Sequence, residues 1–392
     1  MGVWDSLIGQ GAAAETLAAA ARASREDVPS QAMTHAWLIT GPPGSGRSTA
    51  AVAFAAALQC PRGGCGECDA CRAVLSGVHP DVEIVRSETL SYGTEDARAL
   101  VARSAVIPAE APWHVVVVED ADRFTDEAVN VLLKVLEEPP RHLVWLLCAP
   151  SAEDVLPTVR SRTRALQLRT PSTQEVARAL QDRYAVEPAM ASFAARASQG
   201  HIGRARALAI DEEARLRRQE ILRIPDALRD LSACFAAAAE LLASATEDAA
   251  SITDALDARE EQDLRLAYGA GAEGVTRARL DRLSSRAVKD LQRAQKSRRT
   301  RAVRDQVDRA LLDLLSYYRD VLMLQTGADV DLINDEMRNQ LSREAASCNP
   351  ADTARRLAAI ERTRIAVAAN GALPLVLEGL MVELRDPLVL AR

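Results

Sequence analysis

The chain has 392 residues, of which 48% are hydrophobic and 26% are charged, which is typical of a soluble globular protein with two or three domains. Its formal net charge of −7 excludes a global basic field that would attract nucleic acid, and aromatic residues, at 3%, are too few to dominate base recognition. No apolar run reaches the roughly 18 residues of a membrane span, and no secretory leader is present, so we expect a cytoplasmic protein.

Short apolar runs alternate with helical patterns through the first 170 residues. Four of these runs are predicted strands: Ala36–Thr40, Val82–Val85, His114–Val118 and Leu143–Cys148. Helical patterns lie between them, as at Ser48–Leu58 and Asp126–Glu137. Because strands separated by helices pair in parallel through crossover connections, we expect residues 1–170 to form an α/β core with a helix-covered parallel sheet.

A glycine-rich segment, GPPGSGRS at residues 41–48, joins the first predicted strand to the next helix. Glycines at this place let backbone N–H groups turn toward a phosphate, and the helix N-terminus adds a favourable dipole. The segment therefore predicts a nucleotide-binding loop, with the hydroxyl of Ser48 directed at Mg²⁺. The residues expected to bind nucleotide are Gly41, Gly44, Ser45, Gly46, Arg47, Ser48 and Thr49.

Four cysteines follow the helix after this loop, with the spacing C-x4-C-x2-C-x2-C. In a cytoplasmic chain this spacing is typical of tetrahedral Zn²⁺, and four thiolates leave no open position, so the site is expected to be structural. Reduced cysteines without metal and an iron–sulfur cluster are the alternatives. The expected ligands are Cys60, Cys65, Cys68 and Cys71. The other cysteines are expected to be buried: Cys148, Cys234 and Cys348.

Two positions of the predicted nucleotide site depart from the usual chemistry. Arg47 stands where the pattern has a lysine, and a planar guanidinium fits between phosphates less well than a compact ammonium. Glu119 and Asp120 follow the third predicted strand, where a metal-associated acid and a water-activating acid are expected. The second acid is shorter than the usual glutamate, and general-base geometry is sensitive to such a shortfall. We expect weak binding of ATP or ADP with Mg²⁺ and negligible hydrolysis; alternatively, the acids occupy a solvated turn.

The strand signal ends near Thr170. Residues 171–212 are predicted to form a small helical unit, with Ser172 or Thr173 as its N-cap and Gly200 as a breaker. Residues 213–392 are helical in pattern throughout. Loops are predicted at Gly269, Gly271 and Gly274, at Asn349-Pro350 and at Asn370-Gly371. Three domains are therefore expected: the α/β core, a helical lid and an all-α C-terminal domain.

The sequence NVLLKVLEEPP at residues 130–140 predicts a helix that the two prolines end. Its apolar residues share one face: Val129, Leu132, Leu133 and Leu136. Glu137 and Glu138 lie at the negative end of its dipole, a local cost that hints at function, although surface acids are also common.

Several other short segments of the chain are also distinctive. They are Leu7-Ile8-Gly9-Gln10, His35-Ala36-Trp37-Leu38, the four cysteines after the loop helix, His79-Pro80-Asp81 and Ser161-Arg162-Thr163. With the string at 130–140, they resemble the clamp-loader ATPases of bacterial DNA polymerase III, which are AAA+ proteins. The resemblance is strong over residues 1–170 and weak beyond about 215. It implies an AAA+ core (1–170) with a zinc module, a lid (171–212) and an oligomerising collar (213–392).

The resemblance also implies roles for single residues. Arg162 corresponds to an arginine that reaches the nucleotide of a neighbouring subunit. Arg160 and Arg164 alternate with it, so an extended segment would point all three to one side; a solvated basic edge is the alternative. Ala149 stands where a threonine senses the γ-phosphate, and Gly203 stands where the lid has a sensing arginine, one position before Arg204.

These departures favour the delta-prime type of subunit over the gamma/tau motor type. The implied partners are gamma/tau and delta subunits and the sliding clamp, with primer-template DNA contacted mainly through the complex. An unrelated AAA+ ATPase and a DNA-binding module remain as alternatives. The DNA-binding module would use a basic cluster at Lys296, Arg298, Arg299, Arg301 and Arg304, for which a solvated helix face is the competing interpretation.

Overall fold

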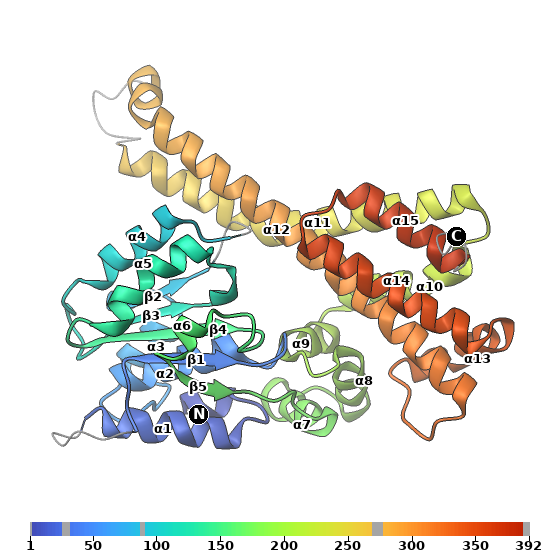
Figure 1. Cartoon of the computed structure of the whole chain (residues 1–392), viewed down its shortest axis with the longest axis horizontal. Helices are drawn as coiled ribbons and strands as arrows, with labels where there is room; N and C mark the ends of the chain where they lie inside the picture. Colours follow the sequence, from blue (N-terminus) through green and yellow to red (C-terminus); the bar gives the residue numbers. More distant parts are fainter. Residues whose placement is uncertain (1, 26–31, 87–90, 269–276, 387–392) are drawn as a thin grey trace. The chain divides into compact units, whose positions relative to one another are not determined.

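The computed structural model describes residues 2–25, 32–86, 91–268 and 277–386. The chain divides into two compact units, Met1–Ile210 (unit 1) and Asp211–Arg392 (unit 2). Unit 1 contains the sheet, and unit 2 is helical (Figure 1). Within the described ranges, no helix is both long and apolar enough to cross a membrane.

Five parallel strands form the sheet of unit 1 in the order β2-β3-β4-β1-β5. Their bounds are β1 Ala36–Thr40, β2 Val82–Val85, β3 His114–Val118, β4 Leu143–Ala149 and β5 Arg164–Gln167. The four predicted strands and their parallel pairing are confirmed, with β4 one residue longer than expected. The edge strand β5 was not predicted, because only Leu166 of its four residues is buried and it therefore lacks an apolar run.

Helices cover both faces of the sheet, and successive strand residues point to opposite faces. In β1, Trp37 and Ile39 pack in the cluster formed with α1 and α2, whereas Ala36 and Leu38 pack in the cluster formed with α4, α5 and α6. The helices of this core are α1 Gly11–Ala23, α2 Arg47–Gln59, α3 Asp69–Leu75, α4 Thr94–Ser104, α5 Asp126–Glu137 and α6 Pro157–Arg160. Short 3-10 turns add η1 Val3–Ser6 and η2 Ala121–Arg123. Central strands buried on both faces read as continuous apolar runs, which explains why their sequences were recognisable.

Three helices complete unit 1, namely α7 Thr173–Tyr184, α8 Pro188–Ser198 and α9 Ile202–Ile210. Ser172 is the N-cap of α7, as predicted. Its hydroxyl accepts from the N–H of Glu175 at 3.3 Å, while the Glu175 carboxylate accepts from the N–H of Ser172 at 2.9 Å. Gly200 separates α8 from α9 with φ +85°. The division of unit 1 at residue 170 stays a prediction.

Unit 2 is entirely helical over its described residues. Its elements are α10 Glu212–Ala227, α11 Leu231–Ala267, α12 Arg277–Thr326, η3 Asp335–Met337, α13 Arg338–Ser347, α14 Pro350–Ala368 and α15 Leu373–Arg385. The predicted breaks at Asn349 and at Asn370-Gly371 are confirmed, since α14 begins after one and ends before the other. The predicted glycine loop lies outside the described residues. The paired α11 and α12 extend beyond the other helices of this unit (Figure 1).

The basic cluster on α12 is largely engaged within unit 2. Arg298 pairs with Glu260 of α11 at 2.6 Å, and Arg299 pairs with Asp254. Arg304 donates to the carbonyl oxygen of Val367 at 2.8 Å. These arginines join helices of unit 2, so the ion pairs weigh against the DNA-binding alternative.

Candidate nucleotide site and cysteine centre

The glycine-rich loop leaves the carboxyl end of β1 and leads directly into α2, the context that a phosphate loop requires. Gly46 is the N-cap of α2 with φ +93°, a conformation that favours glycine. The hydroxyl of Ser45 is buried and has no hydrogen-bond partner among the described residues. Gln10 secures the loop from outside: its amide N–H group donates to the carbonyl oxygens of Ser45 at 3.2 Å and Arg169 at 2.6 Å. The segment Leu7–Gln10 thus supports the loop structurally.

Arg47 is directed back onto the loop that precedes it. Its Nη1 donates to the carbonyl oxygen of Gly41 at 3.0 Å. Inside the loop, the N–H of Ser45 donates to the carbonyl oxygen of Pro42 at 3.1 Å. One N–H group of the loop and one N–H group of the guanidinium are therefore hydrogen-bonded to the protein itself.

The start of α9 covers the loop at Gly44, and sequence reasoning did not identify this contact. A Cβ on Gly44 would lie 2.4 Å from Cγ of His201, and the N–H of Ile202 donates to the Gly44 carbonyl oxygen at 3.3 Å. His201 is held in place because its Nδ1 accepts from the N–H of Arg204 at 3.2 Å. Gly200, which directly precedes His201 and was predicted to break the helix, is the sequence feature that could have indicated this contact. The close approach of His201, through both its Cα and its side chain, requires a glycine at position 44, so this glycine accommodates the start of α9 as well as any phosphate.

The acidic pair after β3 lies in the same electrostatic neighbourhood as Arg47. Burial raises the pKa of the Cys148 thiol to about 12, while the positive charge of Arg47 opposes that rise and the charges of Glu119 and Asp120 add to it. Glu119 also pairs with Arg86 at 3.2 Å. Arg47, Glu119 and Asp120 thus all lie near enough to Cys148 to influence its thiol.

Asp122 is a third acid here that the sequence did not single out. Burial raises the pKa of its carboxyl group, and the charge of Asp120 raises it further. Its Oδ1 is buried without a hydrogen-bond partner among the described residues. Ala149, the last residue of β4, is fully buried beside Thr40 of β1. Alanine has no hydroxyl group, so the side chain at position 149 cannot form a hydrogen bond.

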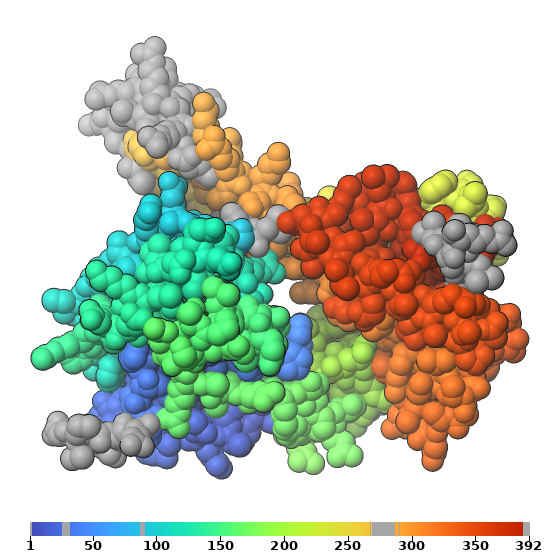
Figure 2. Space-filling view, in the orientation of Figure 1, coloured from blue at the N-terminus to red at the C-terminus, as the bar shows by residue number. Residues whose placement is uncertain are grey.

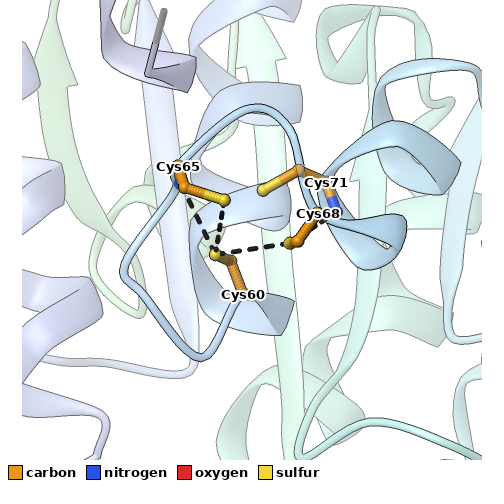
Figure 3. Close-up of side chains that lie close together, drawn as sticks. All are labelled: Cys60, Cys65, Cys68 and Cys71. Atoms are coloured by element: carbon orange, nitrogen blue, oxygen red, sulfur yellow. Dashed lines mark hydrogen bonds between the residues drawn. The ribbon is translucent and has the colours of Figure 1, made fainter.

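The four predicted cysteine ligands converge on one point (Figure 3). Their sulfur atoms all lie within 4.8 Å of one another, with Cys60 3.6 Å from both Cys65 and Cys68. A tetrahedral zinc–thiolate centre with Zn–S bonds of about 2.3 Å requires sulfur–sulfur separations of about 3.8 Å. The donor set and its spacing therefore fit a metal ion of that size.

The surroundings of the cysteines favour the thiolate at some positions and oppose it at another. Desolvation raises the pKa of Cys60, but N–H groups of Cys65, Gly64 and Arg62 outweigh it and lower the pKa to about 6. Burial instead raises the pKa of Cys71, so a metal would be needed to ionise all four. Of the remaining cysteines, Cys148 and Cys234 are buried as predicted, whereas Cys348 is only partly buried. Burial was expected for Cys348, which instead lies at the C-cap of α13, where it is partly buried and packs against the apolar cluster of unit 2.

The N-terminal segment packs against the cysteine loop. The N–H of Val3 donates to the carbonyl oxygen of Gly64 at 2.9 Å, and Nε1 of Trp4 donates to that of Gly63 at 3.3 Å. Arg25 donates to the carbonyl oxygen of Cys60 at 2.6 Å. The cysteine loop is consequently an integral part of unit 1.

Arg162 lies in the turn between α6 and β5, near the end of α5. Its Nε and Nη2 donate to Oε1 of Glu137, the former at 2.8 Å, and its Nη1 donates to the carbonyl oxygen of Thr158 at 2.8 Å. The expected extended segment is wrong, because Arg160 ends α6 and the chain turns before Arg164 begins β5. Arg164 instead donates to Ala32 at 2.7 Å and lies over the ring of Trp37. The three arginines therefore have separate environments.

Comparison with known proteins points to one replication complex. Residues 18–172 match the family model described as DNA polymerase III, delta subunit. The chain is 36% identical over 167 residues to the delta' subunit of DNA polymerase III from Pseudomonas aeruginosa, which covers 40% of this chain and 50% of that protein. It is 32% identical over 137 residues to the delta' subunit from Bacillus subtilis, covering 34% and 42%.

A relative with a different subunit name has a similar identity. The gamma/tau subunit of DNA polymerase III from Mycobacterium tuberculosis is 35% identical over 136 residues, covering 33% of this chain and 24% of that protein. The chain thus spans about half or less of the length of these relatives. Over the matched N-terminal residues it is similar to DNA polymerase III delta' and gamma/tau subunits, and identity alone does not separate the two.

Proposed function

We propose that this chain is a delta-prime subunit of a bacterial DNA polymerase III clamp loader, which helps to load the sliding clamp onto primer-template DNA. Its partners in this role are the gamma/tau and delta subunits and the clamp, and the complex works in the cytoplasm. The observation that carries the proposal is a phosphate loop closed by its own arginine, Arg47, in a chain similar to subunits of this polymerase. Such a loop suits a subunit that organises the complex without consuming ATP.

The degraded state of the ATP site rests on several independent features. The Arg47 guanidinium is bonded to Gly41, and His201 lies against Gly44. Ala149 has no hydroxyl for a γ-phosphate, and Gly203 has no side chain with which to bind one. A nucleotide would first have to break the contacts that close the loop, so affinity is low and hydrolysis negligible. AAA+ architecture, with residues 1–170 as core, 171–212 as lid and 213–392 as collar, is part of this proposal.

The cysteine centre is proposed to hold one structural Zn²⁺ through Cys60, Cys65, Cys68 and Cys71. Four thiolates complete the tetrahedron, so the ion has no open position for chemistry. Its role is to tie the end of α2 to α3 and the packed N-terminal segment. Such a site stabilises unit 1 by binding the folded state.

Arg162 is proposed to act on ATP that a neighbouring gamma/tau subunit holds. A guanidinium beside the γ-phosphate stabilises charge that develops during transfer, and an arginine supplied in trans contributes roughly 10³–10⁵-fold in rate. The segment around α6, light green, lies on the visible surface of unit 1 (Figure 2). A partner's nucleotide can therefore approach it.

Similarity to gamma/tau subunits favours one rival function, an active motor ATPase. Steady ATP turnover by the purified chain would support that rival. The delta-prime proposal is tested by mixing the chain with gamma/tau, delta and clamp from the same host. We expect one assembly that loads the clamp only when this chain is present. Failure to assemble, or loading that does not require the chain, would overturn the proposal.

A further inference from the structure

Arg162 is not a free side chain in the isolated subunit. Glu137 accepts from its Nε and Nη2, and Nη1 donates to the Thr158 carbonyl oxygen at 2.8 Å and to the Ser161 hydroxyl at 3.1 Å. All three guanidinium nitrogens are therefore oriented by this chain. Thr158 and Ser161 belong to the same turn as the arginine, so Glu137 is the only one of these partners that comes from a distant part of the sequence.

The two anchor points of this ion pair are rigid. Glu137 is the last residue of α5, directly after the buried Leu136, and Arg162 follows α6 closely, where Val159 is buried in the same apolar cluster. His35 further fixes the end of α5, because its Nε2 lies 2.9 Å from the Leu136 carbonyl oxygen. A carboxylate at the negative end of a helix dipole is locally unfavourable. Its placement there, facing a cation, points to a use beyond helix stability.

We propose that Glu137 is a positioning residue that aims the guanidinium of Arg162 at the neighbouring subunit's γ-phosphate. This inference rests on the proposed function of Arg162 and adds a second residue to it. A four-bond side chain loses activity quickly when its tip is free to rotate, because misplacement by about 1 Å costs on the order of 10²-fold in rate. Glu137 prevents that rotation through Nε and Nη2.

Two opposing effects of the carboxylate must be weighed. Its negative charge partly offsets the positive charge that Arg162 offers to phosphate, whereas its hydrogen bonds fix the direction of the donors. The side chains of Arg162 and Glu137 are 32% and 48% exposed, so water screens the charge effect. Orientation, at about 10²-fold, is the larger effect. Removal of Glu137 should therefore lower activity rather than raise it.

Glu138 provides a matched control. It is the next residue along the chain, also acidic and exposed, but among the described residues Arg162 forms its ion pair with Glu137 and not with Glu138. Glu137→Ala and Glu138→Ala thus remove the same charge from the same helix end. Only the first removes hydrogen bonds to the arginine.

The experiment uses the reconstituted complex of this chain with gamma/tau, delta, clamp and primer-template DNA. Glu137→Ala should lower the kcat of clamp-stimulated ATP hydrolysis by most of the fall that Arg162→Ala causes, with KM for ATP and the melting temperature unchanged. In an Arg162→Ala background Glu137→Ala should have no further effect. Glu137→Gln, which keeps an oxygen acceptor, should restore most of the activity, and Glu138→Ala should match the wild type.

The outcomes separate this inference from the proposed function. If Arg162→Ala leaves hydrolysis unchanged, the proposed role of Arg162 in trans is wrong. If Arg162→Ala lowers hydrolysis but Glu137→Ala behaves like Glu138→Ala, only the positioning role is wrong. If Glu137→Ala raises hydrolysis, Glu137 restrains the arginine, and the positioning role is again overturned.

Discussion

If the cysteine centre holds zinc as proposed, chelation should destabilise unit 1 and leave unit 2 unaffected. The sulfur atoms already lie within 4.8 Å of one another, so zinc binding needs little rearrangement of the folded chain. A ligand at about 1,000 times its Kd stabilises the folded state by about 4 kcal/mol. For a unit the size of Met1–Ile210, each kcal/mol shifts the Tm by about 2–4 °C, so chelation should lower it by about 8–16 °C.

The distribution of tryptophans makes this shift measurable for one unit alone. All four tryptophans are in unit 1, at positions 4, 37, 113 and 145, so their fluorescence follows the unfolding of that unit. Circular dichroism of helices reports strongly on unit 2. We expect EDTA to move the fluorescence transition down and to leave the later helical transition in place. Elemental analysis of untreated protein should give about one zinc per chain.

Matched variants test whether the effect comes from the centre. Cys65→Ser should lower the fluorescence Tm by a similar amount, and EDTA should then have no additional effect. Cys348→Ser, which removes a thiol from unit 2, should keep its zinc. An unchanged fluorescence transition after chelation, or a disulfide between two of the four cysteines in fresh lysate, would refute the assignment.

Three further outcomes are expected. The isolated chain should hydrolyse ATP at well under 1 s⁻¹, a rate that is itself near the low end of ordinary kcat values. Turnover of about 1 s⁻¹ or above would favour a motor subunit. Arg162→Ala should reduce ATP hydrolysis of the complex only in part, since it serves one of several sites, while Arg160→Ala should have little effect; equal losses would indicate a general basic edge. Asp81→Asn should cost about 1–3 kcal/mol in unfolding free energy, because its buried carboxylate accepts from the N–H groups of Ala109, Glu110 and Ala111 at 2.6–2.9 Å.

The same Asp81 contacts give stability a pH dependence of known sign. Burial raises the pKa of Asp81, but the three N–H groups outweigh it and hold the pKa below its ordinary value. The carboxylate therefore stabilises the fold fully above its unfolded pKa of about 3.9, and this stabilisation is lost as the pH falls through the folded pKa. Asp81→Asn should flatten the acid limb of the stability profile, as followed by urea titration between about pH 5 and pH 3. An unchanged acid limb would show that other carboxylates determine it.

The sequence predicted what local patterns encode. Val115–Val118 reads as a doubly buried strand, the loop glycines mark a strand-to-helix turn, and the cysteine spacing brings four sulfurs together. The edge strand β5 was not predicted, because its residues are mostly exposed and show no apolar run. The contacts of His201 with Gly44 and of Glu137 with Arg162 escaped for a different reason. They join segments that are distant in sequence, and no periodicity or spacing records which exposed side chains meet.

If the loop binds nucleotide as weakly as we propose, its backbone groups must still find partners in the protein. Buried N–H and C=O groups without partners are costly, and this loop supplies partners from within the protein. The Arg47 guanidinium donates to the carbonyl oxygen of Gly41, and the N–H of Ser45 donates to the carbonyl oxygen of Pro42. The N–H of Ile202 donates to the carbonyl oxygen of Gly44. Each of these bonds stabilises the loop in this conformation. The lysine-to-arginine change therefore does more than alter the shape of one cation, because the longer side chain reaches the loop's own carbonyl group. The same unit keeps Arg162 outside that loop and bonded to Glu137 at the surface, so the proposed loss of ATP chemistry in this chain would leave the proposed action of Arg162 on a neighbour intact.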